Sequence, residues 1–206
     1  HRKINWKAIY FILFAEKNTA QDINLEITQV DFLQRIKRLS HTADIGIHPS
    51  YQSNQNPEIM QSERFNLSQV IQKNINSSRQ HYLKMQIPNT YYDLIKIGIL
   101  HDYTMGYASQ IGFRASTCRP FPFFDLQANQ ITFLTLHPFC LMDTTFHAYL
   151  KYTPEQTLAA AKQLLQSVQA VKGVFCTLWH NESMSGYQEW KGWENIYEEL
   201  LSSIYV

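Results

Sequence analysis

The sequence predicts an α/β fold in which a parallel sheet is covered by helices. Apolar runs of strand length alternate with longer stretches of helical periodicity, and this alternation repeats about six times, as expected for βα units. The chain has 206 residues, of which 45% are hydrophobic and 17% charged, which suffices for one domain with a full core. A doubly wound sheet and a closed barrel both fit the pattern. No linker or repeat interrupts it, so a single domain over residues 1–206 is expected.

The first part of the chain predicts two strands and two helices. The apolar run Ala8–Phe14 is typical of a buried strand, and Ile27–Leu39 carries a helical apolar stripe. Ala43–His48 is predicted as the next strand. A polar helix is expected to begin at Asn56–Glu58 and to end near Lys73. Its expected inward positions are Ile59, Phe65, Leu67, Val70 and Ile71.

The middle of the chain predicts short strands around one helix. A short strand is expected just before Ser78. Pro88 suits the first turn of a helix that runs to Lys96 and stops at Gly98. The further expected strands are Ile99–Tyr103, Gly112–Ala115 and Gln130–Leu136.

The last part predicts a helix, a strand and a second helix. Thr153–Glu155 combines an N-cap residue, a proline at the first helical position and an acid, and Leu158–Val171 continues it amphipathically. Gly173 ends this helix. Val174–Trp179 is expected as a buried strand and Trp193–Ile204 as the final helix.

Charge and cysteine content limit the class of partner. The formal net charge of +1 provides no electrostatic surface for nucleic acid or an anionic membrane, so a neutral ligand is expected. No apolar run reaches the roughly 20 residues of a membrane span. The three cysteines, Cys118, Cys140 and Cys176, are widely spaced and match neither a disulfide framework nor a zinc ribbon. Reduced thiols favour a cytoplasmic location.

Polar side chains recur where the predicted strands end, which is where parallel α/β folds place their active sites. Four of the eight histidines lie at such ends, namely His48, His81, His101 and His180. Neutral imidazole binds divalent metals, and imidazolium can protonate a leaving group, so the pattern predicts metal-assisted or acid–base hydrolysis. Ser50 lacks the flanking glycines of a nucleophile elbow, and so does Ser183.

Four motifs in sequence order resemble polysaccharide deacetylases of the NodB-homology type, and a bacterial branch of that superfamily in particular. They are GIHPSY at 46–51, SRQHYLK at 78–84, HDYTMGYASQIGFRAS at 101–116 and LWHNES at 178–183. The resemblance covers nearly the whole chain. It implies a distorted (β/α) barrel of about seven strands. It also implies a divalent metal, often zinc, and hydrolysis of acetyl groups on carbohydrate.

The resemblance also implies a metal site. His48 matches the first metal histidine of the family motif, but the second would fall at Gln52, and an amide oxygen is a poorer zinc ligand than imidazole. His81 could supply the missing nitrogen. The family's aspartates, a metal ligand and a base, end its first strand, and we expect that strand to precede residue 1. The first acid of this chain, Glu16, follows what resembles the family's second strand.

The same resemblance implies further site residues. Arg79 matches the arginine that braces the catalytic aspartate, Asp102 would hold Arg79 in place, and Tyr82 would line the substrate groove. His180 matches the general acid. The remaining residues expected at the substrate are Leu178 and Trp179, as walls of the acetyl pocket, and Arg114.

Structural alternatives exist for these residues. His48, before Pro49, could only bond a backbone carbonyl, and His81 could be packed or exposed on the surface. Both arginines could form salt bridges with Asp102 or Asp125. Structural roles are expected for His137 and His147, core or loop packing for Phe121–Phe124, and helix anchoring for Trp190 and Trp193.

Three functions follow in order of preference. The first is a metal-dependent hydrolase that removes acetyl groups from an N-acetylated carbohydrate. The second is a catalytically degenerate carbohydrate-binding or scaffold module on the same fold, for which Gln52 and the missing acids are the indication. The third is a different barrel-shaped metallohydrolase, such as an amidohydrolase. The sequence indicates no oligomeric state.

Overall fold

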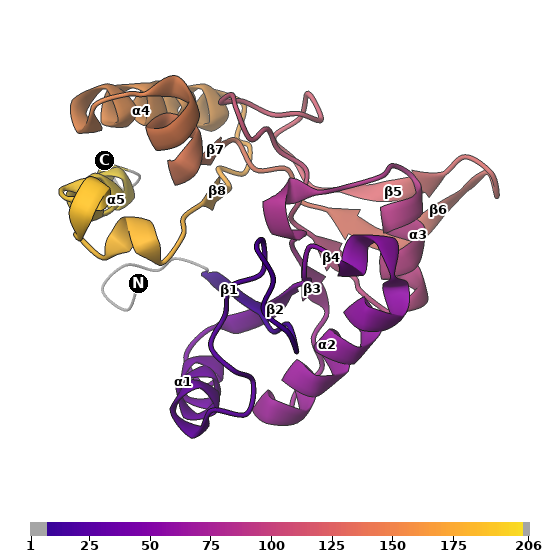
Figure 1. The fold of residues 1–206 in the computed structure, drawn as a ribbon. Helices are drawn as coiled ribbons and strands as arrows, with labels where there is room; N and C mark the ends of the chain where they lie inside the picture. The colour runs from indigo at the N-terminus through magenta and orange to yellow at the C-terminus, as the bar shows by residue number, and fades with distance from the viewer. Residues whose placement is uncertain (1–7, 204–206) are drawn as a thin grey trace. The chain divides into compact units, whose positions relative to one another are not determined.

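The computed structural model describes residues 8–203, and the chain divides into two units (Figure 1). The first unit comprises residues 1–104 and 122–136, and the second comprises residues 105–121 and 137–206. Each has its own sheet. The assignment of residues 1–206 to a single domain stays a prediction. Between residues 8 and 203, no helix is long and apolar enough to cross a membrane.

The sheet of the first unit is open and mostly parallel. Its six strands lie in the order β1-β2-β3-β4-β6-β5, and every pair from β1 to β6 is parallel. The strands are β1 (Ile9–Leu13), β2 (Asp44–His48), β3 (Ser77–Ser78), β4 (His101–Asp102), β5 (Phe121–Asp125) and β6 (Gln130–Leu136). The predicted mixed α/β class is therefore confirmed. The described strands form no closed sheet, so the predicted barrel is not found in them.

The strand register brings the carboxyl ends of four strands to one edge. Leu13 pairs with His48, Ile47 with Ser78, and Ser78 with Asp102. The loops that follow β1, β2, β3 and β4 therefore all leave the sheet at this edge, where parallel folds bind ligands. β1 is the edge strand among the described residues, and the expectation of a further strand before it stays a prediction.

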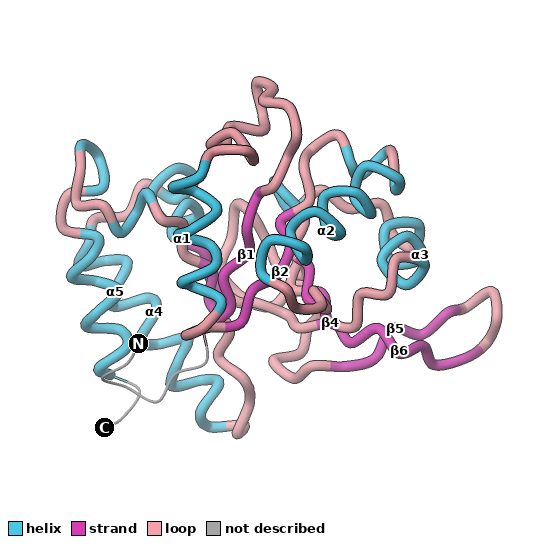
Figure 2. Tube along the Cα trace, turned by 90° about the horizontal axis from the view of Figure 1, so that it is seen from below, coloured by secondary structure: helices cyan, strands magenta, loops and turns pink. Residues whose placement is uncertain are grey.

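Three helices cover this sheet (Figure 2). They are α1 (Val30–Ser40), α2 (Pro57–Ile71) and α3 (Asn89–Lys96). α1 and α2 pack against β2, and α3 packs against β6. The core that they share with the sheet contains fully buried side chains, among them Ile47, Leu67, Ile75, Leu94, Ile99 and Leu134. The strands and helices of this unit are thus held together mainly by apolar burial.

Gly46 in β2 permits a close approach between β1 and the site. A Cβ atom at Gly46 would lie 2.6 Å from the ring of Phe11 and 3.0 Å from the Ser77 carbonyl oxygen. The Phe11 ring therefore lies directly over the backbone of β2. The same ring also contacts two further residues. Its centroid lies 4.5 Å from Cζ of the Arg79 guanidinium and 5.4 Å from the centroid of the Tyr103 ring. The glycine thus determines where Phe11, and with it Arg79, can lie.

The second unit is a short parallel sheet with two helices. β7 (Leu141–Met142) pairs in parallel with β8 (Thr177–Leu178). α4 (Pro154–Ala170) begins with the predicted Thr153 cap, which forms a reciprocal capping box with Gln156. α5 (Trp193–Ser202) follows β8. The core shared by these elements contains Cys140, Leu141, Phe146, Ala161, Trp193, Ile196 and Leu200.

Several local expectations were wrong. Gly112–Ala115, expected as a strand, forms a loop. Phe121–Phe124, expected as core or loop packing, belongs to β5. β5 forms a hairpin with β6 (Figure 2). Phe65, expected to face inward, is 58% exposed. In the predicted strand Val174–Trp179, only the two residues of β8 pair. Ile204 lies outside the described residues.

Candidate functional site

Two histidines and an aspartate meet at the carboxyl edge of the first sheet. We call Asp22, His48 and His81 the histidine cluster. His81 Nδ1 lies 2.8 Å from Asp22 Oδ1, and the rings of His48 and His81 have their centroids 4.7 Å apart. His48 Nδ1 lies 2.5 Å from the Arg79 carbonyl oxygen. Because a carbonyl only accepts hydrogen bonds, Nδ1 of His48 carries the proton.

Two buried carboxylates hold the loop that follows His48. The Ser50 N–H donates to Glu63 Oε2 at 2.9 Å, and the Tyr51 N–H donates to Asp22 Oδ1 at 2.8 Å. Burial raises the pKa of Glu63, although the hydrogen bonds from Ser50 act in the opposite direction. The motif at 46–51 is therefore fixed through its backbone by acids from α2 and from the loop after β1.

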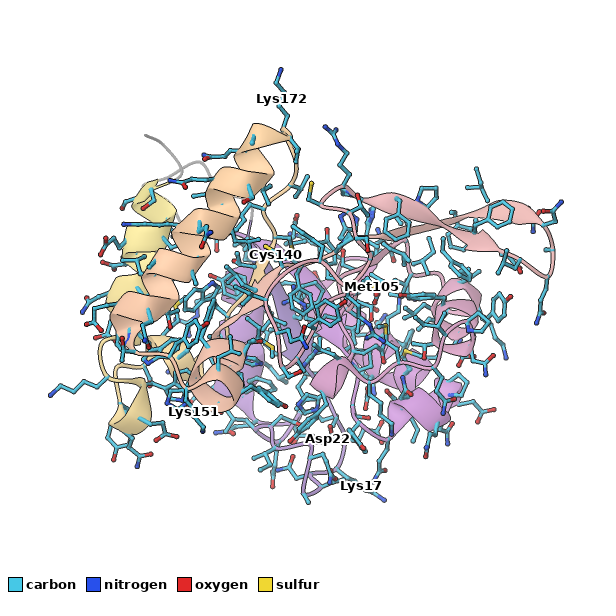
Figure 3. The ribbon with its side chains drawn as sticks, turned by 90° about the horizontal axis from the view of Figure 1, so that it is seen from above. Lys17, Asp22, Met105, Cys140, Lys151 and Lys172 are labelled. Carbon is cyan, nitrogen blue, oxygen red and sulfur yellow. The ribbon has the colours of Figure 1, made fainter. Side chains whose placement is uncertain are left out.

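Asp22 is a member of the cluster that the sequence interpretation missed. It lies in the loop between β1 and α1, where no apolar periodicity marks it (Figure 3). Its backbone N–H donates to Thr19 Oγ1 at 2.9 Å, and the Thr19 hydroxyl donates to its Oδ2 at 3.2 Å. The spacing of a threonine and an acid three residues later was the available signal, because that pattern marks capping turns. The first acid, Glu16, instead accepts from Ser62 and Asn66 on α2.

The histidine cluster provides only part of a metal site. Metal-binding histidines usually have their second nitrogen held by a carbonyl or a carboxylate, and both histidines have this arrangement at Nδ1. Zinc sites in proteins nevertheless use at least three protein ligands. In the part of the chain from 8 to 203, no group of three or more His, Cys, Asp or Glu side chains is arranged to hold a metal ion. The predicted zinc site is therefore not found there.

Arg79 and Asp102 lie buried beside the cluster. Arg79 is 9% exposed, and its Nε donates to the Tyr103 carbonyl oxygen at 3.2 Å. Asp102 accepts from the hydroxyl and the N–H of Thr104, at 2.7 and 3.0 Å. Burial raises the pKa of Asp102 to about 6, whereas these two hydrogen bonds and the charge of Arg79 act to lower it. The Asp102 carboxylate and the Arg79 guanidinium thus interact electrostatically. The expectation that Asp102 holds Arg79 in place stays a prediction.

Tyr82 is exposed next to the cluster. Its ring centroid lies 4.7 Å from that of His81 and 5.6 Å from that of Tyr51. Lys84 Nζ lies 3.7 Å from the centre of the Tyr51 ring, a cation–π distance. Tyr82 also has a backbone φ of 56°, in the left-handed region that non-glycine residues rarely adopt. Exposed rings at this edge are consistent with contact to a sugar, which stays a prediction.

A second aspartate–histidine pair lies in the second unit. His180 Nδ1 lies 2.7 Å from Asp143 Oδ1, and the His180 N–H donates to Asp143 Oδ2 at 2.6 Å. The Ser183 hydroxyl donates to the same Oδ2 at 2.5 Å, and the Thr144 N–H donates to Oδ1 at 2.7 Å. The Asp143 side chain is fully buried, whereas that of His180 is 41% exposed. Each carboxylate oxygen therefore accepts one backbone N–H and at least one side-chain donor, and Oδ1 also accepts from the Thr144 hydroxyl at 3.3 Å.

These contacts decide the ionisation of Asp143. Burial alone would raise the pKa of this carboxyl, but the hydrogen bonds and the charge of His180, together with Ser183, outweigh burial and keep the pKa below its usual value. Sequence interpretation missed Asp143 because β7 has only two residues, too few for a periodic pattern. The register that pairs Met142 with Leu178 brings the residues that follow each strand together.

The other expected residues of the second unit differ in exposure. Leu178 is 4% exposed and belongs to the core, and its role as a wall of an acetyl pocket stays a prediction. Trp179 is partly buried against Tyr197, with ring centroids 5.0 Å apart, and its buried Nε1 has no hydrogen-bond partner among the described residues. Arg114 is exposed in the loop before β5 and forms no ion pair with the described residues. The ring of His147 packs against that of Trp190 at a tilt of 32°, with centroids 4.3 Å apart.

Two solved structures resemble this chain. A Mycobacterium smegmatis protein assigned as a polysaccharide deacetylase matches with a TM-score of 0.64 and 12% sequence identity, over 98% of this chain and 67% of its own. A Bordetella bronchiseptica protein assigned as a polysaccharide deacetylase involved in O-antigen biosynthesis has a TM-score of 0.49 and 13% identity, over 97% of this chain and 71% of its own. No protein-family model and no curated protein sequence matches. The first likeness confirms, at the level of the fold, the resemblance stated from the motifs.

Proposed function

We propose that this chain is a hydrolase that removes acetyl groups from an N-acetylated carbohydrate. The fold shared with the Mycobacterium smegmatis protein supports the proposal. The observation that carries it is the His180–Asp143 pair, in which a half-exposed histidine at a strand end is held by a buried carboxylate. His180 stands in LWHNES, the motif that resembles the source of the general acid in polysaccharide deacetylases.

In this proposal His180 protonates the departing amine. Because Asp143 holds the proton on Nδ1, the proton that His180 transfers is the one on Nε2. Cleavage of the C–N bond of an acetamide needs this proton, since an amide anion is a very poor leaving group. The exposure of His180 makes its ring accessible to a substrate, and the burial of Asp143 protects the carboxylate from water.

His81 is a separate candidate base, proposed from the contacts of the first unit alone. Asp22 holds Nδ1 of His81, so Nε2 of the neutral ring is an acceptor that can take a proton from water. Hydrolysis of an acetamide forms a bond between a water oxygen and the acetyl carbon, breaks the C–N bond and transfers a proton to nitrogen, which yields acetate and a free amine. We propose Arg79 and Asp102 as positioning residues, because both are buried, and the exposed Tyr82 as a substrate contact.

The resemblance assigns His48 and His81 to a metal, which would polarise the acetyl carbonyl. The described donor set lacks a third ligand, so the acid and base roles above rest on the two aspartate–histidine pairs alone.

The direct test is acetate release from oligomers of N-acetylglucosamine, with and without added divalent cations. The wild-type chain should release acetate, and His180→Ala should lower the rate by about 10²- to 10⁴-fold, the usual contribution of a positioned acid. His41→Ala is the matched control, since His41 is an exposed histidine at the end of α1. A folded chain that releases no acetate from any N-acetylated glycan under either condition would contradict the proposal.

The incomplete metal donor set favours one other function, a non-catalytic carbohydrate-binding module on the same fold. This alternative predicts that glycan is retained on an affinity gel without acetate release. It also predicts that His180→Ala leaves retention unchanged. Loss of acetate release in that variant alone would exclude the alternative.

A further inference from the structure

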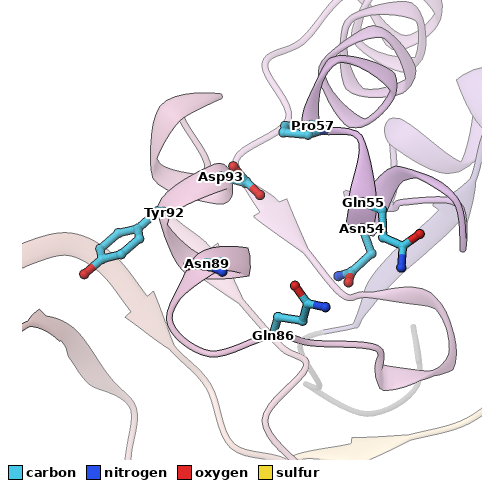
Figure 4. A pocket seen from close by; sticks show the side chains of 7 residues that line it. All are labelled: Asn54, Gln55, Pro57, Gln86, Asn89, Tyr92 and Asp93. Carbon is cyan, nitrogen blue, oxygen red and sulfur yellow. The ribbon is translucent and has the colours of Figure 1, made fainter.

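A polar pocket lies in the first unit, outside the histidine cluster. It has a volume of about 380 Å³ and lies between the segment after β2, the start of α2 and the first turns of α3 (Figure 4). Ligand sites in proteins typically have volumes of about 300–1,000 Å³, so one sugar ring or a molecule of similar size can enter it. The residues used below are Asn54, Gln55, Gln86, Asn89 and Asp93.

One side chain of this pocket has an unsatisfied acceptor. Asn54 is 8% exposed, and its Nδ2 donates to the Lys84 carbonyl oxygen at 2.8 Å and to Thr90 Oγ1 at 3.3 Å. Because a backbone carbonyl only accepts, the contact with Lys84 fixes which end of the amide is nitrogen. The other terminal atom of the Asn54 amide is therefore the oxygen, Oδ1. It is buried and accepts no hydrogen bond from the described residues.

A buried acceptor without a donor is costly, and such groups in native proteins are usually satisfied by water or a ligand. Figure 4 shows the carboxamides of Asn54 and Gln86 directed into the same space, while the Tyr92 ring points away from it. The Tyr92 hydroxyl donates to Asp125 Oδ1 at 2.8 Å, which fixes that outward orientation. The pocket therefore offers hydrogen bonds rather than an aromatic stacking surface.

The lining also selects the charge of an occupant. It contains four carboxamides and one carboxylate, Asp93, and no Lys, Arg or His among the seven lining residues. An anionic ligand would meet the Asp93 charge, and Lys96, the cation whose charge acts on Asp93, does not line the pocket. Carboxamides both donate and accept, as vicinal hydroxyl groups do, so the chemistry matches a neutral polyhydroxylated ring.

We propose that this pocket binds a neutral saccharide unit, with the amides of Gln86 and Asn89 bonding its hydroxyls and a further sugar hydroxyl donating to Asn54 Oδ1 after the side chains around that buried oxygen move apart. The inference rests on the proposed function only in taking this unit to belong to the same glycan. It adds a binding subsite that holds the polymer independently of the acid and base.

The experiment is a titration of the ¹⁵N-labelled full chain with the trimer of N-acetylglucosamine, followed through side-chain amide signals. The test variant is Gln86→Ala combined with Asn89→Ala. Both side chains are exposed and form no hydrogen bond with the described residues, so folding should be retained. Gln127→Ala is the matched control, an exposed glutamine in the β5–β6 turn of the same unit.

We expect saturable shifts of the Asn54, Gln86 and Asn89 amide signals. Loss of two neutral hydrogen bonds should weaken binding about tenfold in the double variant, while the control binds as the wild type does. An oligogalacturonate of equal length should bind more weakly because it is anionic. The inference would be overturned if the trimer shifted signals elsewhere in the chain but not those of the pocket. It would also be overturned if the double variant bound the trimer with the affinity of the wild type. Acetate release, measured separately, decides the proposed function, since the double variant leaves His81 and His180 intact.

Discussion

Replacing Asp143 with asparagine tests the proposed acid most directly. Each carboxylate oxygen of Asp143 accepts a backbone N–H, from Thr144 at 2.7 Å and from His180 at 2.6 Å. An asparagine presents one oxygen and one NH₂ group, so in either orientation an NH₂ faces a backbone N–H. One backbone donor must then lose its acceptor. If the NH₂ takes the Oδ1 position, Nδ1 of His180 can no longer donate, and the proton moves to the wrong ring nitrogen.

The cost can be estimated from these contacts. A buried donor without a partner costs about 1–3 kcal/mol, and loss of a charge-assisted bond adds a similar amount. Because His180 is 41% exposed, solvent screens the Coulombic part, and we expect the free energy of unfolding to fall by about 2–4 kcal/mol. The rate constant kcat should fall by about 10²- to 10⁴-fold, with little change in KM, because a misplaced proton affects only the transition state.

Urea unfolding gives the stability change, acetate release gives kcat and KM, and NMR of the His180 ring gives the tautomer. Asp125→Asn is the matched control, since Asp125 also accepts two backbone N–H groups, from Gln127 and Ala128, but in the β5–β6 turn. The reasoning fails if Asp143→Asn keeps the wild-type kcat, or if Asp125→Asn lowers kcat equally.

Three other substitutions test how the two units are built. The pKa of Asp102 is raised from 3.8 to about 6, so the folded state binds this proton more tightly, and the free energy of unfolding should fall by about 2 kcal/mol as the pH rises from 4 to 6. Asp102→Asn should remove that pH dependence in urea unfolding, and an unchanged pH dependence would assign it to another group. Gly46→Ala places a methyl group 2.6 Å from the Phe11 ring and should lower the free energy of unfolding by about 1–3 kcal/mol. Adding Phe11→Leu should restore part of that loss. A wild-type melting temperature for Gly46→Ala would contradict the packing argument. Thr153→Ala removes the capping box of α4 and should cost about 0.5–2 kcal/mol, whereas no change in unfolding would show that the cap is dispensable.

The histidines of the candidate site could be located from sequence, but their acidic partners could not. His48 and His180 follow apolar runs that predict strands, and the parallel sheet brings such ends together. Asp22 and Asp143 carry no such mark. The loop of Asp22 has no periodicity, and the strand before Asp143 has two residues. Long-range contacts from irregular segments are set by tertiary packing, which one sequence does not encode in a local pattern.

The same limit explains the errors in the fold. Gln130–Leu136 alternates polar and apolar side chains and was predicted with its observed bounds. Its partner β5 contains Pro122 and consecutive aromatic residues, so the alternation that would identify a strand is absent. On α2, Phe65 was expected inside because it is apolar, yet Glu63 is buried there instead. Glu63 is buried because the Ser50 N–H needs an acceptor, which depends on a loop distant in sequence.

The two aspartate–histidine pairs follow one structural rule, although they lie in different units. In each pair the histidine follows a parallel strand, and the acid comes from the segment after another parallel strand of the same sheet. The histidine side chain is partly exposed, while the carboxylate is almost or completely buried, at 1% for Asp22 and 0% for Asp143. A carboxylate so buried must have its oxygens satisfied, and both acids achieve this with backbone N–H groups in addition to the imidazole. Those backbone bonds fix the carboxylate before any substrate binds, so each imidazole is oriented by the fold itself, as acid–base catalysis requires.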